Sequence, residues 1–319
     1  MQWYWVVVIA AGAAIAAYLT LCIVIAMRVL KTAVTPVAHT LDEARVTQAK
    51  NENMDFADYD SEWNKQNFEV NGVHGKIRGE VVFNGSAPYS KVAVICHGHT
   101  WNRINSIKYA REFYRLGYSL VLYDHAYFGQ SEGDFTTLGL YEKQDLNSVL
   151  TYVRGVFGKD AIVGLHGESM GAATVLLELG VRDDVDFVVA DCPFSDTMKY
   201  YRELCTDLTH LPSFPIVDVA NAVSKRKYGY DFNKVKPIDA VAGSAVPVCF
   251  IHGAADTFIR PHHSEDMYKV SASPLSELHL VTGAGHACSF KTDNAGYRKI
   301  VENFVVKVED NLTQLKKVS

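Results

Sequence analysis

The stretch Gly164-Leu165-His166-Gly167-Glu168-Ser169-Met170-Gly171-Ala172-Ala173 is predicted to be a short strand that turns sharply and continues directly into a helix. Within it, the spacing Gly167-x-Ser169-x-Gly171 is typical of a nucleophile elbow, in which a strained backbone lifts the serine hydroxyl clear of the sheet edge. A β-carbon at either glycine would collide with the neighbouring strand or helix. Ser169 is therefore the candidate nucleophile, and a serine in an ordinary strand-to-helix turn is the alternative interpretation.

Strands and helices alternate on both sides of this turn. The apolar runs are short and uninterrupted, which indicates strands covered on both faces of a parallel sheet and joined by right-handed crossovers. An Asn-Gly pair at 71–72, between partly alternating runs, predicts a hairpin at the antiparallel edge of the sheet. The predicted strands cover residues 92–96, 119–124, 160–165, 185–191, 247–253 and 277–281, and the predicted helices cover 104–116, 138–157, 172–179 and a terminal segment from about Asn294.

Composition narrows the class of protein. The chain has 319 residues, of which 48% are hydrophobic and 21% charged, proportions that fit one globular α/β domain with an appendage. The net charge is -5 and there is no long run of Lys or Arg, whereas nucleic-acid binding needs a basic face. No nucleic-acid partner is therefore expected. The 6 cysteines lack metal-site spacing and are expected to be reduced.

The N-terminal segment is predicted to be a single-pass membrane anchor. From Trp3 to Leu30 the residues are apolar apart from Arg28, a length that exceeds the roughly 20 residues needed to span a bilayer core. A cleaved signal peptide is the alternative, although such peptides carry a positive leading region and a shorter apolar core. Because Arg28 and Lys31 mark the inner end, the positive-inside rule places the remaining chain in the cytoplasm.

These observations predict an anchor at residues 1–31, a juxtamembrane linker at 32–66 and an α/β domain at 67–319. The linker is polar, acidic and aromatic in patches, with one helical piece. Regularity falls at about 197–245, where aromatic, proline and apolar residues mix. We expect a small cap over the carboxyl ends of the strands there, suited to an apolar substrate. The alternative is that these residues only pack on the domain.

Two further residues complete a candidate catalytic triad. In proteins with this elbow the partners follow in the order Ser, then Asp or Glu, then His, each beyond the end of a strand. Asp256 and His286 meet this requirement after the last two predicted strands. His286 would take the proton of Ser169, and Asp256 would orient the ring and stabilise the imidazolium. Asp191 and Asp196 are rival acids.

The loop after strand 92–96 reads His97-Gly98-His99-Thr100. An acyl-transfer enzyme needs backbone N–H groups aimed at the developing oxyanion, one from the residue after the nucleophile and one from this loop. Met170 and His99 are the expected donors, and Thr100 is the second choice for the loop donor. His97-x-His99 also fits part of a zinc site, but a third and fourth ligand do not follow nearby. We expect no metal and no cofactor.

A second polar turn, at residues 124–133, is rich in glycine. Asp124 and His125 open it, directly after a predicted strand. Both side chains suit catalysis, but we expect them to hold this loop beside the elbow instead.

Together these motifs resemble those of bacterial membrane-anchored α/β-hydrolases, which are often grouped with serine aminopeptidase-like and lysophospholipase-like proteins. The resemblance covers roughly residue 68 to the C-terminus. It implies the α/β-hydrolase fold, with a mostly parallel central sheet, helices on both faces and a small cap insertion. The sequence His99-Thr100-Trp101 departs from the group's pattern in the oxyanion loop. The motifs are Gly167-Glu168-Ser169-Met170-Gly171, His97-Gly98, Asp124 with Gly129, Ser131 and Gly133, His252-Gly253 with Asp256, and Gly285-His286.

The expected function is hydrolysis of carboxylic esters through an acyl-enzyme on Ser169. Membrane attachment and an apolar cap favour lipid or acyl-chain esters as substrates, with the membrane itself as a partner. Because this fold hosts esterases, lipases, thioesterases and peptidases alike, a peptidase or amidase on the same triad is the first alternative. A catalytically silent, membrane-anchored binding protein is the second, and the complete set of Ser, Asp and His weighs against it.

Overall fold

The computed structural model describes residues 2–87 and 89–318 and contains an eight-stranded sheet in the order β1-β2-β4-β3-β5-β6-β7-β8. β2 pairs antiparallel with β1 and with β4, and the other neighbouring pairs are parallel. This confirms the predicted, mostly parallel sheet. The strands are β1 Asn64–Gly72, β2 Gly75–Phe83, β3 Lys91–Cys96, β4 Ser119–Tyr123, β5 Ile162–Glu168, β6 Phe187–Asp191, β7 Val248–Gly253 and β8 Glu277–Val281.

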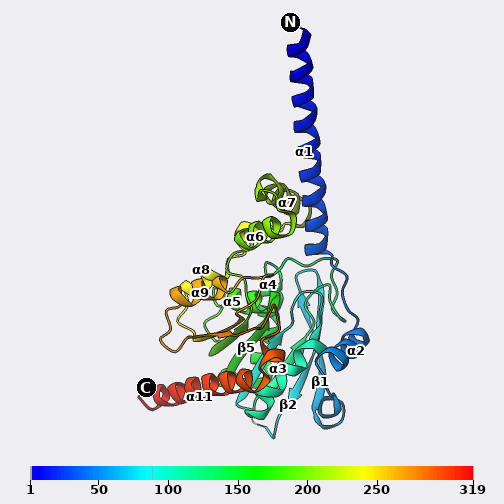
Figure 1. The fold of residues 1–319 in the computed structure, drawn as a ribbon. Coiled ribbons are helices and arrows are strands. Elements are labelled where there is room, and N and C mark those ends of the chain that lie inside the picture. Colours follow the sequence, from blue (N-terminus) through cyan, green and yellow to red (C-terminus); the bar gives the residue numbers. More distant parts are fainter. Residues whose placement is uncertain (1, 88, 319) are drawn as a thin grey trace.

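Helices cover both faces of the sheet (Figure 1). On one face lie α4 Glu142–Phe157, α5 Met170–Glu178, α8 Pro237–Ala242 and α9 His262–Val270, and on the other lie α3 Arg103–Arg115 and α11 Asn294–Val318. Alternate residues of β3 divide between the two cores, Val92 and Val94 facing the first and Ala93 and Ile95 the second. This is the pattern of a strand buried on both sides. A short helix, α10 Ser289–Thr292, precedes α11.

The hairpin turn lies two residues later than predicted. Gly72 pairs with Gly75, so Val73 and His74 form the turn in place of the Asn-Gly pair. The N–H of Val73 donates to Oδ1 of Asp145 on α4 at 2.7 Å. This contact with a distant helix helps to fix the register of the hairpin. The turn preferences of residues 71–74 alone do not predict it.

Residues 32–66 were expected to be a linker, and in the structure they are packed chain. They contain α2 Leu41–Asn51 and a π-helical turn, η1 Asp58–Glu62. Thr40 and Glu43 form a capping box at the start of α2. Tyr59 and Trp63 are buried in the core under α3, and the hydroxyl of Tyr59 donates to Glu80 on β2 at 2.7 Å. Aromatic residues that seemed scattered in the sequence therefore extend the core.

Helix α1, Gln2–Val34, projects from the domain with its N-terminal end far from the sheet (Figure 1). In the described part of the chain it is the one helix long and apolar enough to cross a membrane. By length and composition it suits a membrane span or a signal sequence. Met1, the first residue of the predicted anchor, and Ser319, the last residue of the predicted α/β domain, lie outside the described residues.

The insertion between β6 and β7 contains α6 Thr197–Thr209, α7 Ser213–Tyr228 and a short 3₁₀ turn, η2 Phe232–Lys234, before α8. α6 and α7 stand beside the lower half of α1, away from the sheet, whereas α8 packs against α9 on the domain (Figure 1). The cap helices share an apolar core with α1 and with the elbow residue Met170. The cap and α1 therefore form one packed body above the carboxyl ends of the strands.

Candidate active site

Ser169 stands at the turn between β5 and α5 with φ 55° and ψ -114°. This left-handed backbone is rarely adopted by residues other than glycine, and such strain is typical of functional turns. A β-carbon on Gly167 would lie 2.3 Å from the Gly171 carbonyl, and one on Gly171 would lie 2.2 Å from the Cys96 carbonyl. The predicted steric role of both glycines is therefore confirmed, since the strand, the helix and β3 approach too closely for any side chain.

The structure brings Ser169, His286 and Asp256 together at the carboxyl end of the sheet. The hydroxyl Oγ of Ser169 lies 2.9 Å from Nε2 of His286. The opposite ring nitrogen, Nδ1, lies 2.7 Å from Oδ2 of Asp256. Because the ring donates its Nδ1 proton to the carboxylate, Nε2 is left with a lone pair toward the serine, which is the tautomer that a general base needs.

The carboxylate of Asp256 is held in place from three sides. Its Oδ1 accepts hydrogen bonds from the backbone N–H groups of Phe258 and Ile259, at 2.8 and 2.9 Å. Nε2 of His252 lies 3.3 Å from Oδ2. Burial alone would raise the pKa of Asp256, but the interactions with His252 and His286 and the backbone N–H bonds outweigh burial and hold it below its usual range. The carboxylate is therefore ionised at neutral pH.

The rival acids lie elsewhere. Asp196 is the N-cap of α6, where its Oδ1 accepts from the N–H of Lys199 at 2.9 Å. Asp191 is buried at the end of β6, and burial together with the nearby charge of Glu168 raises its pKa to about 7. Its Oδ2 accepts from the Tyr109 hydroxyl at 3.5 Å. Among the described residues, only Asp256 of these three carboxylates is bonded to His286.

Asp124 has the structural role that was expected. It is fully buried and accepts from the backbone N–H groups of Arg103 and Gln130 at 2.8 and 2.9 Å, and it is paired with the Arg103 guanidinium. His125 is also fully buried, and burial beside His97 holds its pKa well below the usual value. Asp124 therefore holds the turn through its hydrogen bonds, whereas His125 contributes ring packing against His97 and Tyr123, and neither residue lines the cavity at Ser169.

The two expected oxyanion donors lie beside the serine. Met170 and His99 line the same cavity as Ser169, whereas Thr100 is not part of its lining. A β-carbon on Gly98 would lie 3.7 Å from Cβ of Ser169, so the loop passes close to the nucleophile. His99, and not Thr100, therefore borders the space beside Ser169.

The histidines of this loop are held by backbone carbonyls. Nδ1 of His97 donates to the Gly98 carbonyl at 2.8 Å, while Nε2 accepts from the N–H of His125 at 2.9 Å. Burial lowers the pKa of His97 to about 4. Nε2 of His99 donates to the carbonyl of Ala33 at 2.9 Å. The two rings therefore point to different partners and do not share a metal position.

Other side chains are spaced closely enough to share an ion. Glu203 on α6 lies 3.1 Å from His262 and 3.3 Å from His263 on α9. These residues join the cap to the domain and lie outside the lining of the serine cavity. Cys192 forms a second group with Asp256 and His286, but burial holds the pKa of its thiol well above the usual value, so it is protonated and a poor ligand.

The cavity at Ser169 has a volume of about 320 Å³, within the range of small-molecule sites. Apolar and aromatic side chains dominate its wall, and the cap contributes residues of α6, among them Tyr200, Leu204 and Leu208. The wall is completed by Val29, Thr32 and Ala33 of α1, which the sequence did not predict. Only the tertiary structure reveals their place, because the sequence marks them merely as the end of an apolar helix.

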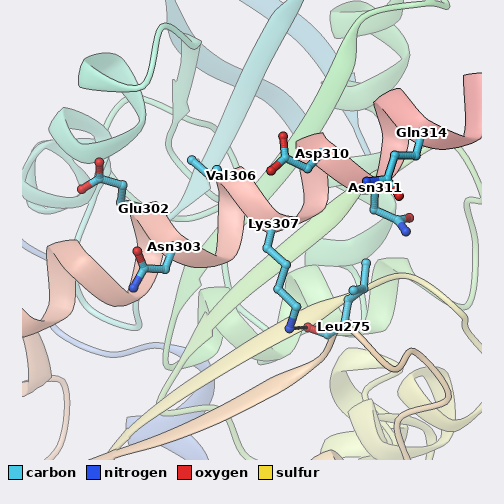
Figure 2. A pocket seen from close by; sticks show the side chains of 8 residues that line it. All are labelled: Leu275, Glu302, Asn303, Val306, Lys307, Asp310, Asn311 and Gln314. Carbon is cyan, nitrogen blue, oxygen red and sulfur yellow. Dashed lines mark hydrogen bonds between the residues drawn. The ribbon is translucent and has the colours of Figure 1, made fainter. Parts of the chain in front are cut away.

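A larger groove, of about 570 Å³, runs along α11 near β8 (Figure 2). Its side chains are mostly polar or charged, and Lys307 donates to the carbonyl of Leu275 across it at 3.4 Å. None of the 8 lining residues is a serine, cysteine or histidine. The groove therefore offers no nucleophile and base pair, and the cavity at Ser169 is the candidate active site. The lining is Leu275, Glu302, Asn303, Val306, Lys307, Asp310, Asn311 and Gln314.

The mostly parallel sheet, the strained serine between β5 and α5, and the histidine and aspartate beside it define the class as an α/β-hydrolase of the serine hydrolase type. The chain belongs to the prolyl oligopeptidase family, whose sequence profile matches residues 135–310. This agrees with the resemblance noted from the motifs.

Two relatives and two solved structures illustrate the similarity. The chain is 32% identical over 310 residues to the uncharacterized protein YqkD of Bacillus subtilis, covering 96% of this chain and 98% of the relative. It is 23% identical to the uncharacterized protein YfhR of Escherichia coli, covering 76% and 81%. The Pyrococcus furiosus esterase Pf2001 superposes with a TM-score of 0.66 at 20% identity, covering 80% and 95%. A Pyrococcus horikoshii acylaminoacyl peptidase superposes with a TM-score of 0.58 at 17% identity, covering 76% and 41%. The two superpositions support the fold.

Proposed function

We propose that the protein hydrolyses carboxylic esters with an apolar acyl group, using Ser169, His286 and Asp256 as its triad. The observation that carries the proposal is the continuous chain of contacts from Asp256 through His286 to Ser169, which ends at an apolar cavity. The Ser169 oxygen attacks the ester carbonyl while Nε2 of His286 takes the serine proton and then delivers it to the leaving alcohol. Water, activated by the same nitrogen, releases the acid from the acyl-enzyme.

The oxyanion of each tetrahedral intermediate would accept hydrogen bonds from the N–H groups of Met170 and His99. Both residues border the cavity beside Ser169. Met170 is the first residue of α5, so the positive end of that helix adds to the stabilisation. Losing a single donor of this kind typically costs about 10²-fold or more in kcat.

The cavity wall favours an ester over a peptide. A peptidase usually needs a charged or hydrogen-bonding site for a terminus or a side chain, and among the lining residues only Arg28 carries a full charge at neutral pH. Family membership and the fold of the acylaminoacyl peptidase support peptide or amide hydrolysis as the second candidate.

A substrate panel separates the two candidates. We expect the kcat/KM of p-nitrophenyl esters to rise about fourfold with each added CH₂ until the cavity is full, because each buried CH₂ contributes about 0.8 kcal/mol. Aminoacyl p-nitroanilides are expected to be cleaved far more slowly. Faster cleavage of the anilides would favour the peptidase, and failure to cleave either series would favour the silent binding protein.

We also propose that α1 is retained as a membrane anchor, with the domain in the cytoplasm. Cys22, Ala26 and Leu30 of α1 are buried against the cap, so removal as a signal peptide would strip the cap of its partner. We expect the membrane fraction to retain the protein after carbonate washing, with an intact mass that includes Gln2–Val34. A soluble product that begins after α1 would contradict this.

A further inference from the structure

The end of α1 is built into the candidate active site. Val29, Thr32 and Ala33 line the cavity together with Ser169. The carbonyl of Ala33 accepts a hydrogen bond from Nε2 of His99 at 2.9 Å, which ties α1 to the loop that passes close to the nucleophile. An anchor that served only to hold the protein at a membrane would not need either contact.

The length of α1 places the cavity at the surface of a bilayer. The cap covers α1 from Cys22 onward, and the more N-terminal positions from Trp3 to Leu21 are exposed on α1. At about 1.5 Å per residue this stretch spans roughly 28 Å, close to the roughly 30 Å of a hydrocarbon core. The small residues Cys22 and Ala26, which are fully buried, allow α7 to approach α1 closely at that level.

The exposed surface of the cap and of the adjoining part of α1 carries both apolar side chains and cations. Leu208, on the cavity wall, is 68% exposed, and Phe214 at the start of α7 is 66% exposed. Arg28, Lys31 and Lys227 line a groove between α1 and α7 on the cap side of the exposed stretch. Exposed apolar side chains combined with cations are expected of a surface that rests on a bilayer.

We propose that the substrate is a long-chain acyl ester of a membrane lipid, which passes laterally from the bilayer between α1 and α6 to Ser169, so that α1 helps determine acyl-chain specificity. This inference rests on the proposed ester hydrolysis. In the first step the Ser169 oxygen bonds to the acyl carbon, the ester C–O bond breaks, and the lipid alcohol leaves with the proton held by His286. In the second step water supplies the hydroxyl that releases the fatty acid and restores Ser169.

The test uses the full chain in phosphatidylcholine vesicles that contain phosphatidylglycerol, with 4-methylumbelliferyl oleate dissolved in the bilayer and the acetate ester dissolved in water. In Val29→Trp the indole fills the cavity between α1 and α6. We expect the ratio of oleate to acetate turnover to fall at least about tenfold, because the indole occupies space that the long acyl chain needs and the acetyl group does not; tenfold corresponds to about 1.4 kcal/mol. Leu21→Trp, two turns away on the exposed part of α1, is the matched control and is expected to leave the ratio unchanged.

The outcomes of this test separate the possible failures. An unchanged ratio in folded Val29→Trp, or an equal fall in Leu21→Trp, would overturn the role of α1. The wild type could turn over the acetate ester and be labelled by the fluorophosphonate without turning over the oleate ester. That result would overturn the lipid substrate and leave the proposed ester hydrolysis standing. Absence of labelling in the wild type would overturn the lipid substrate and the ester hydrolysis together. If Val29→Trp melts at a lower temperature, Val29→Ala decides, because a wider cavity is expected to raise the ratio and a falling or unchanged ratio contradicts the inference.

Discussion

Replacement of Ser169 by alanine is expected to lower kcat for p-nitrophenyl butyrate by at least about 10⁴-fold. The variant lacks the oxygen that lies 2.9 Å from Nε2 of His286, so no acyl-enzyme forms and only oxyanion binding remains. The substitution removes a single oxygen from a residue in a strained turn and leaves the packing around it unchanged. Fluorophosphonate labelling, followed by mass spectrometry of the labelled peptide, measures the same loss directly.

Ser195 provides a matched control because it also contacts a histidine. Its Oγ lies 2.8 Å from Nδ1 of His263, whose Nε2 lies 3.3 Å from Glu203. This set imitates a triad in composition, but Ser195 is buried and outside the cavity lining. Ser195→Ala is therefore expected to keep labelling and turnover. Labelling that survives in Ser169→Ala, or that disappears in Ser195→Ala with the fold intact, would contradict the assignment.

Asp256→Asn is expected to lower kcat by about 10³–10⁴-fold. The existing contacts dictate how the new amide would lie. Its oxygen would keep the two backbone N–H bonds from Phe258 and Ile259, which turns the NH₂ group toward Nδ1 of His286. The ring must then carry its proton on Nε2, and it is no longer able to accept the proton of Ser169. Steady-state kinetics with p-nitrophenyl butyrate measures the effect.

The pH dependence of the wild type and of this variant provides a second readout. Because the pKa of Asp256 is held below its usual range, this carboxylate contributes no titration to kcat/KM above about pH 4. A lowered pKa stabilises the folded state above the unfolded pKa, and this contribution is lost as the pH falls through the folded pKa. Asp256→Asn is therefore expected to have a lower Tm than the wild type at neutral pH. This difference in Tm should shrink below about pH 4. A Tm difference that grows in acid would contradict a lowered pKa of Asp256 in the folded state.

Asp191→Asn is the control for the acid. Asp191 accepts from Tyr109, and its substitution leaves the contact between Asp256 and His286 intact. We expect activity to persist in this variant. A loss as large as that of Asp256→Asn would mean that Asp191 supports His286.

Local rules were enough to predict the sheet and the elbow. Buried parallel strands appear as uninterrupted apolar runs, and a serine flanked by glycines at this spacing follows from steric exclusion between β5, α5 and β3. The positions of Asp256 and His286 in the chain followed from the order of strands, because parallel strands bring the loops after their carboxyl ends to one edge. These inferences depend on contacts that repeat in every sheet of this kind.

The turn of the β1–β2 hairpin was predicted wrongly, and residues 32–66 were interpreted as a linker. In both places the deciding contacts join residues far apart in the chain, such as Val73 with Asp145 and Tyr59 with Glu80. A sequence pattern records what a residue prefers but not which partner will reach it. The same reason explains why the sequence did not reveal the contribution of α1 to the cavity.

By itself, the sequence determined the class of fold, the strained serine and the loops that carry its two partners, because periodic burial and glycine sterics act over a few residues. Only the tertiary structure decided that Ser169, His286 and Asp256 meet at hydrogen-bond distance, and that the cap and α1 enclose one apolar cavity beside them. The physical reason is that a cavity wall is a product of packing, in which each element buries the face that its neighbours leave open.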